Sequence, residues 1–247
     1  MNIDYSSCNK KFEKKGFFVC KKIFTKSFVS NLIEEIYKSK KSINYYDKNN
    51  KLRRIEKLYD KGQYLIDANK IILELMKKIF LKNFLIFKDK FNAKPPGGEG
   101  FYAHYDGIFR FKDNNDVLKD GWYEYGNYFL NALIALDKCS KSNGTIELAN
   151  AHQGSFNDLL KNTKNNGTPA LANEIELKTN FELINLDIGD VVFFSHTCPH
   201  RSKKNNTNRD RRILYYTYSL EENGSKYNEY FSDKYKSKNS LKALTDK

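Results

Sequence analysis

Paired cysteines and long apolar runs are both missing from this sequence. Its four cysteines include no CxxC pair, so their spacing fits neither a zinc ribbon nor a redox dithiol. Isolated thiols in a chain of 247 residues are typical of a reducing compartment. No apolar run reaches the roughly 18 residues needed to cross a bilayer, and the N-terminus lacks the charged-then-apolar pattern of a signal peptide. We therefore expect a cytoplasmic protein with no membrane partner.

Linkers and internal repeats are missing too. No stretch rich in Pro, Gly and Ser divides the chain, so we expect a single domain over residues 1–247. Within it, residues 1–90 should form an N-terminal buttress, residues 91–222 a β-rich core and residues 223–247 a basic surface tail. A hydrophobic content of 40% and an aromatic content of 15% supply enough apolar mass for a packed interior, which excludes a fully disordered protein.

Positive charge is in excess: 43 Lys and Arg against 30 Asp and Glu give a net charge of +13. Such a balance can indicate a polyanionic partner. The lysines are spread along the whole sequence beside abundant Asn, Ile, Tyr and Phe, a mixture that an AT-rich coding bias would also produce. Because no nucleic-acid recognition motif accompanies the charge, nucleic acid is not the partner we expect.

Two amphipathic helices are predicted in the N-terminal third. The first covers 28–36, where apolar residues form a helical stripe. The second should start near Asp67, a good N-cap residue, because apolar residues follow it at i, i+3, i+4, i+7 and i+8. These residues are Ile72, Leu75, Met76, Ile79 and Phe80. We expect both helices to support a sheet.

Short β-like segments dominate the rest of the chain beyond KPPGGEG, a turn-rich break at 94–100. Short strands separated by turn residues predict an antiparallel barrel or jelly roll, so the expected fold is mainly β with flanking helices. Two longer polar stretches, 107–127 and 155–180, are candidate lids or binding loops. The predicted strands are 17–24, 100–105, 128–137, 144–149, 182–187, 190–195 and 211–220.

Histidine is scarce, with four in the chain, and one of them forms an HxD pair. His104 and Asp106 stand at i and i+2 at the end of a predicted strand, so their side chains should point to the same face. With one distant histidine they would make two imidazoles and one carboxylate, the set that binds Fe(II) and leaves three coordination positions open. Open positions let a co-substrate and dioxygen bind, so the pattern favours oxidation chemistry over a structural metal.

The third ligand has more than one candidate. His196 and His200 both lie near the end of the strand 190–195, at i and i+4. His152 is expected to be structural, in the turn after 144–149. Cys198 keeps a Cys/His zinc site as an alternative, although a fourth ligand would have to come from scattered residues.

The segments 190–195 and 211–220 are expected to form a hairpin that places His200 and Arg211 on one face. A guanidinium beside a metal can hold a carboxylate through two parallel hydrogen bonds. A dicarboxylic keto acid would then bind the metal at one end and Arg211 at the other, with Ser202 adding a hydroxyl. Arg212 should face the opposite way, because neighbouring strand residues alternate.

Five sequence blocks resemble the phytanoyl-CoA dioxygenase family of Fe(II)/2-oxoglutarate-dependent oxygenases and occur in that family's order. The blocks are KPP (94–96), HxD (104–106), NGTIELANAH (143–152), GDVVFF (189–194) and HxSxxNxTxxxR (200–211). The likeness spans about residues 85–220, and FEKKGFFVCKKIF resembles the family's usual opening. The chain departs from the pattern at Arg201, where Gly is usual, at Tyr105, where Gln is common, and at 149–152, where Pro-Gly-Ser-His is usual.

The resemblance implies a double-stranded β-helix, a jelly roll of the cupin type, with defined site residues. His104, Asp106 and His200 would be the metal ligands and the catalytic centre. His200 is preferred to His196 because it stands eleven residues before Arg211, as in the family. The far carboxylate of 2-oxoglutarate would be held by Arg211 and Ser202, with Lys94 assisting. Because related halogenases lack the carboxylate, Asp106 favours hydroxylation.

The implied function is that of a dioxygenase that uses Fe(II) and 2-oxoglutarate, with dioxygen, to hydroxylate an unactivated C–H bond. The loop residues Trp122, Tyr123 and Tyr125 would line the pocket of a small polar substrate, or would instead pack the loop onto the barrel. Two alternatives remain: a non-catalytic jelly-roll module whose basic surface contacts an acidic partner, and an oxygenase that acts on a macromolecule.

Overall fold

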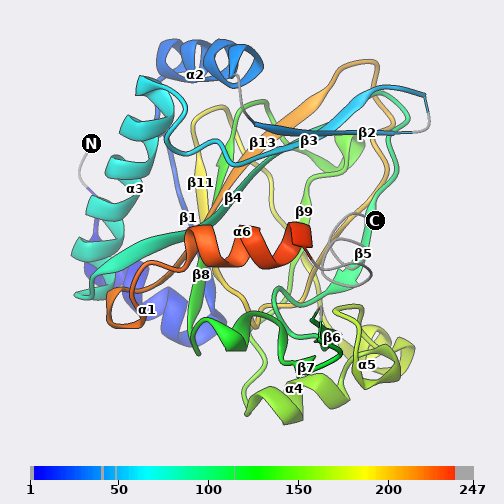
Figure 1. The fold of residues 1–247 in the computed structure, drawn as a ribbon. Helices are drawn as coiled ribbons and strands as arrows, with labels where there is room; N and C mark the ends of the chain where they lie inside the picture. Colours follow the sequence, from blue (N-terminus) through cyan, green and yellow to red (C-terminus); the bar gives the residue numbers. More distant parts are fainter. Residues whose placement is uncertain (1–2, 40–41, 48, 114, 237–247) are drawn as a thin grey trace.

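Two antiparallel sheets form the centre of the computed structural model, which describes residues 3–39, 42–47, 49–113 and 115–236 (Figure 1). The larger sheet has the strand order β1-β11-β8-β13-β4-β3-β2, and the smaller has the order β10-β9-β12-β5. β6 and β7 form a separate two-stranded ribbon. This is the double-stranded β-helix arrangement with flanking helices that was expected.

The strands have the following bounds: β1 (Phe17–Cys20), β2 (Ile43–Tyr46), β3 (Leu52–Glu56), β4 (Phe84–Lys94), β5 (Phe101–His104), β6 (Phe111–Lys112), β7 (Leu118–Lys119), β8 (Phe129–Ala135), β9 (Ile146–Leu148), β10 (Glu182–Leu183), β11 (Val191–Ser195), β12 (His200–Ser202) and β13 (Arg211–Leu220). The α-helices are α1 (Tyr5–Lys15), α2 (Lys26–Lys38), α3 (Gln63–Phe80), α4 (Phe156–Lys161), α5 (Asn173–Lys178) and α6 (Tyr227–Lys236). Every predicted strand region contains a strand, although β10 is shorter than expected.

The central strands of the larger sheet are buried on both faces, which explains their nearly continuous apolar sequence. On β11, Val191 and Phe193 pack into the core beneath the helices, whereas Val192 and Phe194 pack between the two sheets. The alternation follows from the strand geometry, in which successive side chains point to opposite faces. The space between the two sheets, where Val192 and Phe194 pack, leads into the cavity described below.

The helices α1, α2 and α3 lie together on one side of the larger sheet (Figure 1). α2 confirms the predicted stripe: it buries Val29, Leu32 and Ile36. α3 begins earlier than expected, because Gly62 and not Asp67 is its N-cap. Its first two turns bury apolar residues, so packing extends the helix backwards past the residue with the best capping side chain. None of the described helices is long and apolar enough to cross a bilayer.

The predicted hairpin is wrong. β8 lies between β11 and β13 and pairs with both of them. His200 belongs to β12 in the smaller sheet, whereas Arg211 begins β13 in the larger one. The chain passes from the larger sheet to the smaller one between β11 and β12, and it returns between β12 and β13. No local sequence pattern predicts such a crossing. His200 and Arg211 nevertheless line the same cavity, from opposite sheets.

The expected basic surface tail, 223–247, is described as far as Lys236, and within that part Tyr227–Lys236 forms α6 across β4 (Figure 1). The rest of the expected tail, 237–247, lies outside the described residues. Tyr227, Tyr230, Phe231 and Lys234 are buried and stand at i, i+3, i+4 and i+7. This helical stripe was present in the sequence, but the high lysine content of the segment obscured it. The expected boundary between residues 90 and 91 falls inside β4, so the first ninety residues share the larger sheet.

Lys234 joins α6 to the larger sheet through a buried ion pair. Its Nζ donates to both carboxylate oxygens of Glu56, at 2.8 and 2.7 Å. Burial alone would raise the pKa of Glu56, but Lys234 and Arg54 outweigh it and lower that pKa to about 2. Glu56 therefore stabilises the fold above its unfolded pKa, and this contribution is lost as the pH falls toward about 2.

Replacing Lys234 by Met should lower the free energy of unfolding by about 3 kcal/mol at neutral pH, because it leaves a buried carboxylate without its main counter-charge. Urea denaturation measures the change. The double variant Glu56→Gln/Lys234→Met should recover most of the loss and should show a weaker dependence of stability on pH below 4.5. Equal stability of the single variant and the unmodified protein would contradict this account.

Candidate metal centre

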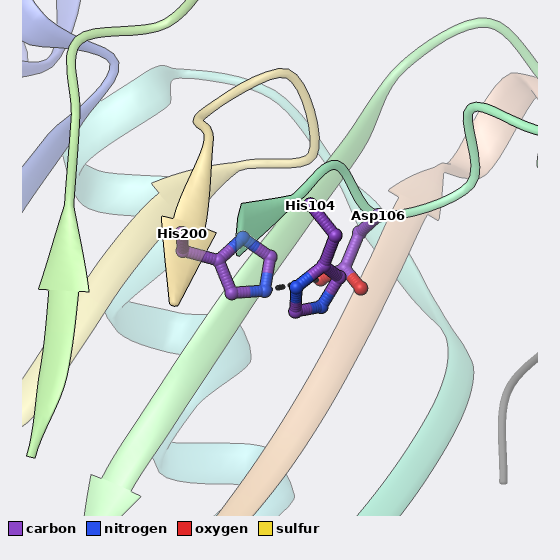
Figure 2. A group of neighbouring side chains, drawn as sticks. All are labelled: His104, Asp106 and His200. Carbon is purple, nitrogen blue, oxygen red and sulfur yellow. Dashed lines mark ion pairs between the residues drawn. The ribbon is translucent and has the colours of Figure 1, made fainter. Parts of the chain in front are cut away.

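The pairing of β5 with β12 brings two histidines face to face. His104 is the antiparallel partner of His200, and the centroids of their rings are 4.1 Å apart. Asp106 follows β5 directly, and its Oδ2 lies 3.7 Å from His200 Nε2. Figure 2 shows the two imidazoles and the carboxylate pointing toward one another. One ligand atom from each residue lies within 4.8 Å of the other two, a spacing that a single metal ion can bridge.

Backbone carbonyls hold both imidazole rings in the orientation that a metal needs. His104 Nδ1 lies 2.8 Å from the carbonyl oxygen of Tyr102, and His200 Nδ1 lies 3.0 Å from that of Cys198. A carbonyl oxygen only accepts, so each Nδ1 carries the proton and each Nε2 keeps its lone pair. A metal-binding histidine typically has such a partner on its other nitrogen.

The ionisation of the three groups also suits a cation. Burial lowers the pKa of His104 to about 3 and also lowers that of His200, so both rings are neutral at pH 7. Burial would raise the pKa of Asp106, but His200 and Lys90 outweigh it and hold that pKa well below its usual range. Two neutral imidazoles and one carboxylate make a donor set that fits Fe(II).

A buried pair that the sequence analysis missed orients Asp106. Asn131 Nδ2 donates to Asp106 Oδ2 at 3.0 Å, and Thr217 Oγ1 donates to Asn131 Oδ1 at 2.7 Å. Both residues are buried on neighbouring strands, β8 and β13. The signal was a lone amide in the apolar run YFLNALIA, because a buried amide requires partners.

Arg211 lines the same cavity, and its guanidinium has a donor without an acceptor. The residue is 3% exposed, its Nε has no hydrogen-bond partner, and within the described residues it forms no ion pair. A buried guanidinium without an acceptor is costly, and a carboxylate would satisfy it in a bidentate manner. The cavity therefore offers a buried donor that suits a carboxylate.

Lys94 and Ser202, the other residues expected at that end, are bound to each other. Lys94 Nζ donates to Ser202 Oγ at 2.8 Å and to the carbonyl oxygen of Gly144 at 3.1 Å. Burial, and secondly the nearby Arg211, lower the pKa of Lys94 to about 6. Lys94 faces Arg211 across the β4–β13 pairing, so it can position Ser202 beside that guanidinium.

The remaining candidate residues lie outside the three-residue cluster. His196 is buried, with Nδ1 at the backbone of Phe129 and Nε2 3.2 Å from the hydroxyl of Tyr123. His152 binds the hydroxyl of Tyr105. Cys198 contributes its carbonyl oxygen to His200, as described above, and its Sγ lies 3.2 Å from the carbonyl oxygen of Gly16. The Cys/His zinc alternative thus has no cluster among the described residues.

The loop aromatics divide between the two roles that were considered. Trp122 lines the cavity and also packs against Phe87, with ring centroids 5.3 Å apart. Tyr125 packs the loop down, and its hydroxyl donates to Asp233 of α6 at 2.8 Å. Arg110 forms an ion pair with Asp120 at 2.8 Å. Arg212 pairs with Asp137 at 2.7 Å and does not line the cavity, as the strand alternation predicted.

The polar stretch 155–180 is folded against the site. It contains α4 and α5, and its backbone joins the edge of β5: Tyr105 N donates to Pro169 O at 3.0 Å, and Leu171 N donates to Ala103 O at 2.9 Å. Phe156, Leu159, Leu160 and Leu171 form an apolar cluster with Tyr105. The stretch therefore forms a wall that holds the HxD segment in place.

These elements enclose about 870 Å³ of space between atoms, open solvent included, of which about 80 Å³ is accessible to the centre of a water-sized molecule. The lining of this cavity includes Lys88, Lys90 and Asn92 on β4 and Arg54 on β3. The sequence analysis missed these residues, although the alternation in KDKFNAK (88–94) was a signal for a polar strand face.

Comparison with known proteins agrees with this geometry. The 2-aminoethylphosphonate dioxygenase of the uncultured bacterium HF130_AEPn_1 is 24% identical over 177 residues, 71% of this chain and 61% of that protein. The methylphosphonate hydroxylase of Gimesia maris is 30% identical over 154 residues, 62% of this chain and 52% of that protein. This chain thus covers little more than half the length of these relatives.

Among solved structures, EctD from S. alaskensis with 2-oxoglutarate and 5-hydroxyectoine has a TM-score of 0.69 at 14% identity, covering 90% of this chain and 80% of that one. Another structure of EctD contains bound iron. At this identity the likeness shows the fold that the chain shares with these structures. The family model for phytanoyl-CoA dioxygenase (PhyH) matches residues 12–213, and the chain belongs to that family.

Replacing Asn131 by Ala should weaken metal binding by about 10- to 100-fold, because loss of a residue that orients a ligand typically has an effect of this size. The three ligands themselves are unchanged. Titration with Co(II), followed by visible absorption, measures the affinity. Asn180→Ala, an exposed amide, is the matched control and should bind Co(II) like the unmodified protein. Unchanged affinity in Asn131→Ala would mean that Asp106 is oriented without it.

Proposed function

We propose that this chain is an Fe(II)- and 2-oxoglutarate-dependent hydroxylase that acts on a C–H bond of a small, polar and anionic substrate. The observation that carries the proposal is the cluster of His104, Asp106 and His200 in one cavity with the unpartnered Arg211. A module that only bound ligands would have no need for this combination. Family membership supports the same reading.

The three clustered residues would hold the iron. His104 and His200 would each offer Nε2, and Asp106 would offer a carboxylate oxygen that Asn131 keeps in position. Three ligands from one side leave positions open for a co-substrate and for dioxygen. Iron with 2-oxoglutarate, when bound, supplies the oxidation of the C–H bond by dioxygen, while the protein supplies binding, orientation and exclusion of water.

Arg211 would hold the far carboxylate of 2-oxoglutarate. Its buried guanidinium needs an acceptor, and it lies across the cavity from the ligand strands β5 and β12. Ser202 would add a hydroxyl, because Lys94 donates to its oxygen and leaves its own hydrogen free to donate. Lys94 would act through Ser202.

The relatives suggest the substrate class. Two of them carry the names of enzymes that act on small phosphonates. The lining of the cavity includes the cationic residues Arg54, Lys88 and Lys90, which suit a small anion. Methylphosphonate and 2-aminoethylphosphonate are therefore the first compounds to test.

Replacing Arg211 by Met should weaken 2-oxoglutarate binding by about 30-fold or more, because truncation of one partner of a buried charge pair costs about 2 kcal/mol or more. Binding is measured anaerobically, from the visible band that forms when 2-oxoglutarate joins the Fe(II)-loaded protein. Arg212→Met is the matched control, since Arg212 pairs with Asp137 outside the cavity.

Asp106→Ala should abolish that band and the release of succinate, because it removes one iron ligand. Succinate is measured in air with and without a phosphonate substrate. A protein that forms no band with Fe(II) and 2-oxoglutarate, or an Asp106→Ala variant that releases succinate at the original rate, would refute the proposed function.

A further inference from the structure

One face of β4 carries four polar side chains, of which Lys88, Lys90 and Asn92 line the cavity. Lys88, Lys90, Asn92 and Lys94 alternate with Asp89, Phe91 and Ala93, which face the other way. Phe91 and Ala93 pack into the core beneath the helices. A strand inside a protein rarely carries so much charge on one face, so each of these groups requires a partner.

Two of the four, Lys94 and Lys88, have evident partners or surroundings. Lys94 is bound to Ser202 and to backbone carbonyls. Lys88 Nζ lies 4.8 Å from the centroid of the Trp122 ring and 5.4 Å from that of Tyr230. Asn92 lines the cavity with an Oδ1 that accepts no hydrogen bond.

Lys90 is different. Its Nζ lies 4.7 Å from the centroid of the Tyr215 ring. Within the described residues it has no hydrogen-bond acceptor and no carboxylate at ion-pair distance, and it lines the cavity. The face of a phenol ring compensates an ammonium group only in part. Burial lowers the pKa of Lys90 to about 7, and the carboxylate that opposes this most strongly is that of Asp106, which lies beyond ion-pair distance. The geometry therefore leaves an amino group that lines the cavity and makes no direct ion pair with the described residues.

Lys90 is too far along the strand to share a ligand carboxylate with Arg211. Arg211 pairs with Lys94, and Lys90 pairs with Tyr215 four residues further along both strands. Four residues of a β-strand extend about 13 Å. The cavity thus has two separate positions for negative charge, one at Arg211 and one at Lys90.

We propose that Lys90 binds the anionic group of the primary substrate, at a subsite separate from the one that holds 2-oxoglutarate. This assignment rests on the proposed function, since it takes Arg211 to be occupied by the co-substrate. It makes Lys90 a residue that selects for charge: a substrate with a phosphonate, phosphate or carboxylate group is bound, and its uncharged counterpart is not.

Calorimetric titration tests the proposal on protein loaded with Co(II) and 2-oxoglutarate, with ethylphosphonate as the charged probe and propionamide as the neutral one. Lys90→Met should weaken ethylphosphonate binding by about tenfold or more, because it removes a charged hydrogen-bond donor. Lys90→Arg should restore part of the affinity. Lys70→Met, an exposed lysine on α3, should leave binding unchanged. Propionamide should show no comparable binding to any of these proteins.

A second readout comes from Trp122, which is the single tryptophan of the chain and lines the cavity. Its fluorescence should change on addition of ethylphosphonate to the unmodified protein and should change at higher concentrations in Lys90→Met. Retention of 2-oxoglutarate binding by Lys90→Met shows that the variant is folded.

The outcomes separate the two proposals. If Lys90→Met binds both 2-oxoglutarate and ethylphosphonate as the unmodified protein does, the Lys90 assignment is overturned and the proposed function stands. The assignment also fails if the unmodified protein binds 2-oxoglutarate but binds ethylphosphonate no better than propionamide. If the unmodified protein does not bind 2-oxoglutarate, the proposed function fails and the Lys90 assignment falls with it.

Discussion

The antiparallel pairing of β5 with β12 is the contact on which the site depends. It sets His104 opposite His200, and the backbone that follows β5 brings Asp106 to the same point. A slip of one residue would turn an imidazole to the other face of the sheet. The segment 155–180 opposes such a slip in register, because its backbone forms hydrogen bonds with the chain on both sides of His104.

The interior between the sheets combines apolar packing with charge. Val192 and Phe194 belong to its apolar cluster, whereas Lys90, Asn92 and Arg211 line the cavity. Such groups would be unfavourable in a closed core. Their presence is understandable if anions complete the site, so stability and ligand binding are coupled through the same side chains.

The sequence was sufficient for the local elements and for the HxD pair, because strand alternation and helical stripes depend on neighbouring residues. It was insufficient where chain crossings decide the outcome. The position of β8 between β11 and β13 refuted a hairpin that looked reasonable locally. Asn131 was missed because it is a single polar residue whose partners are brought close only by folding. Lys90 was missed because only folding shows that its face of β4 lines a cavity. α6 was missed because lysines hid its buried stripe.

The ion pair between Lys234 and Glu56 constrains how these two positions can change in evolution. Glu56 lies within the region that the family shares, residues 12–213, whereas Lys234 lies beyond it. If the C-terminal end were replaced by that of a relative, the Glu56 carboxylate would lose Lys234 as its counter-charge unless the new end supplied another cation. We would thus expect these two positions to change together among descendants of this gene, although 178 residues separate them along the chain.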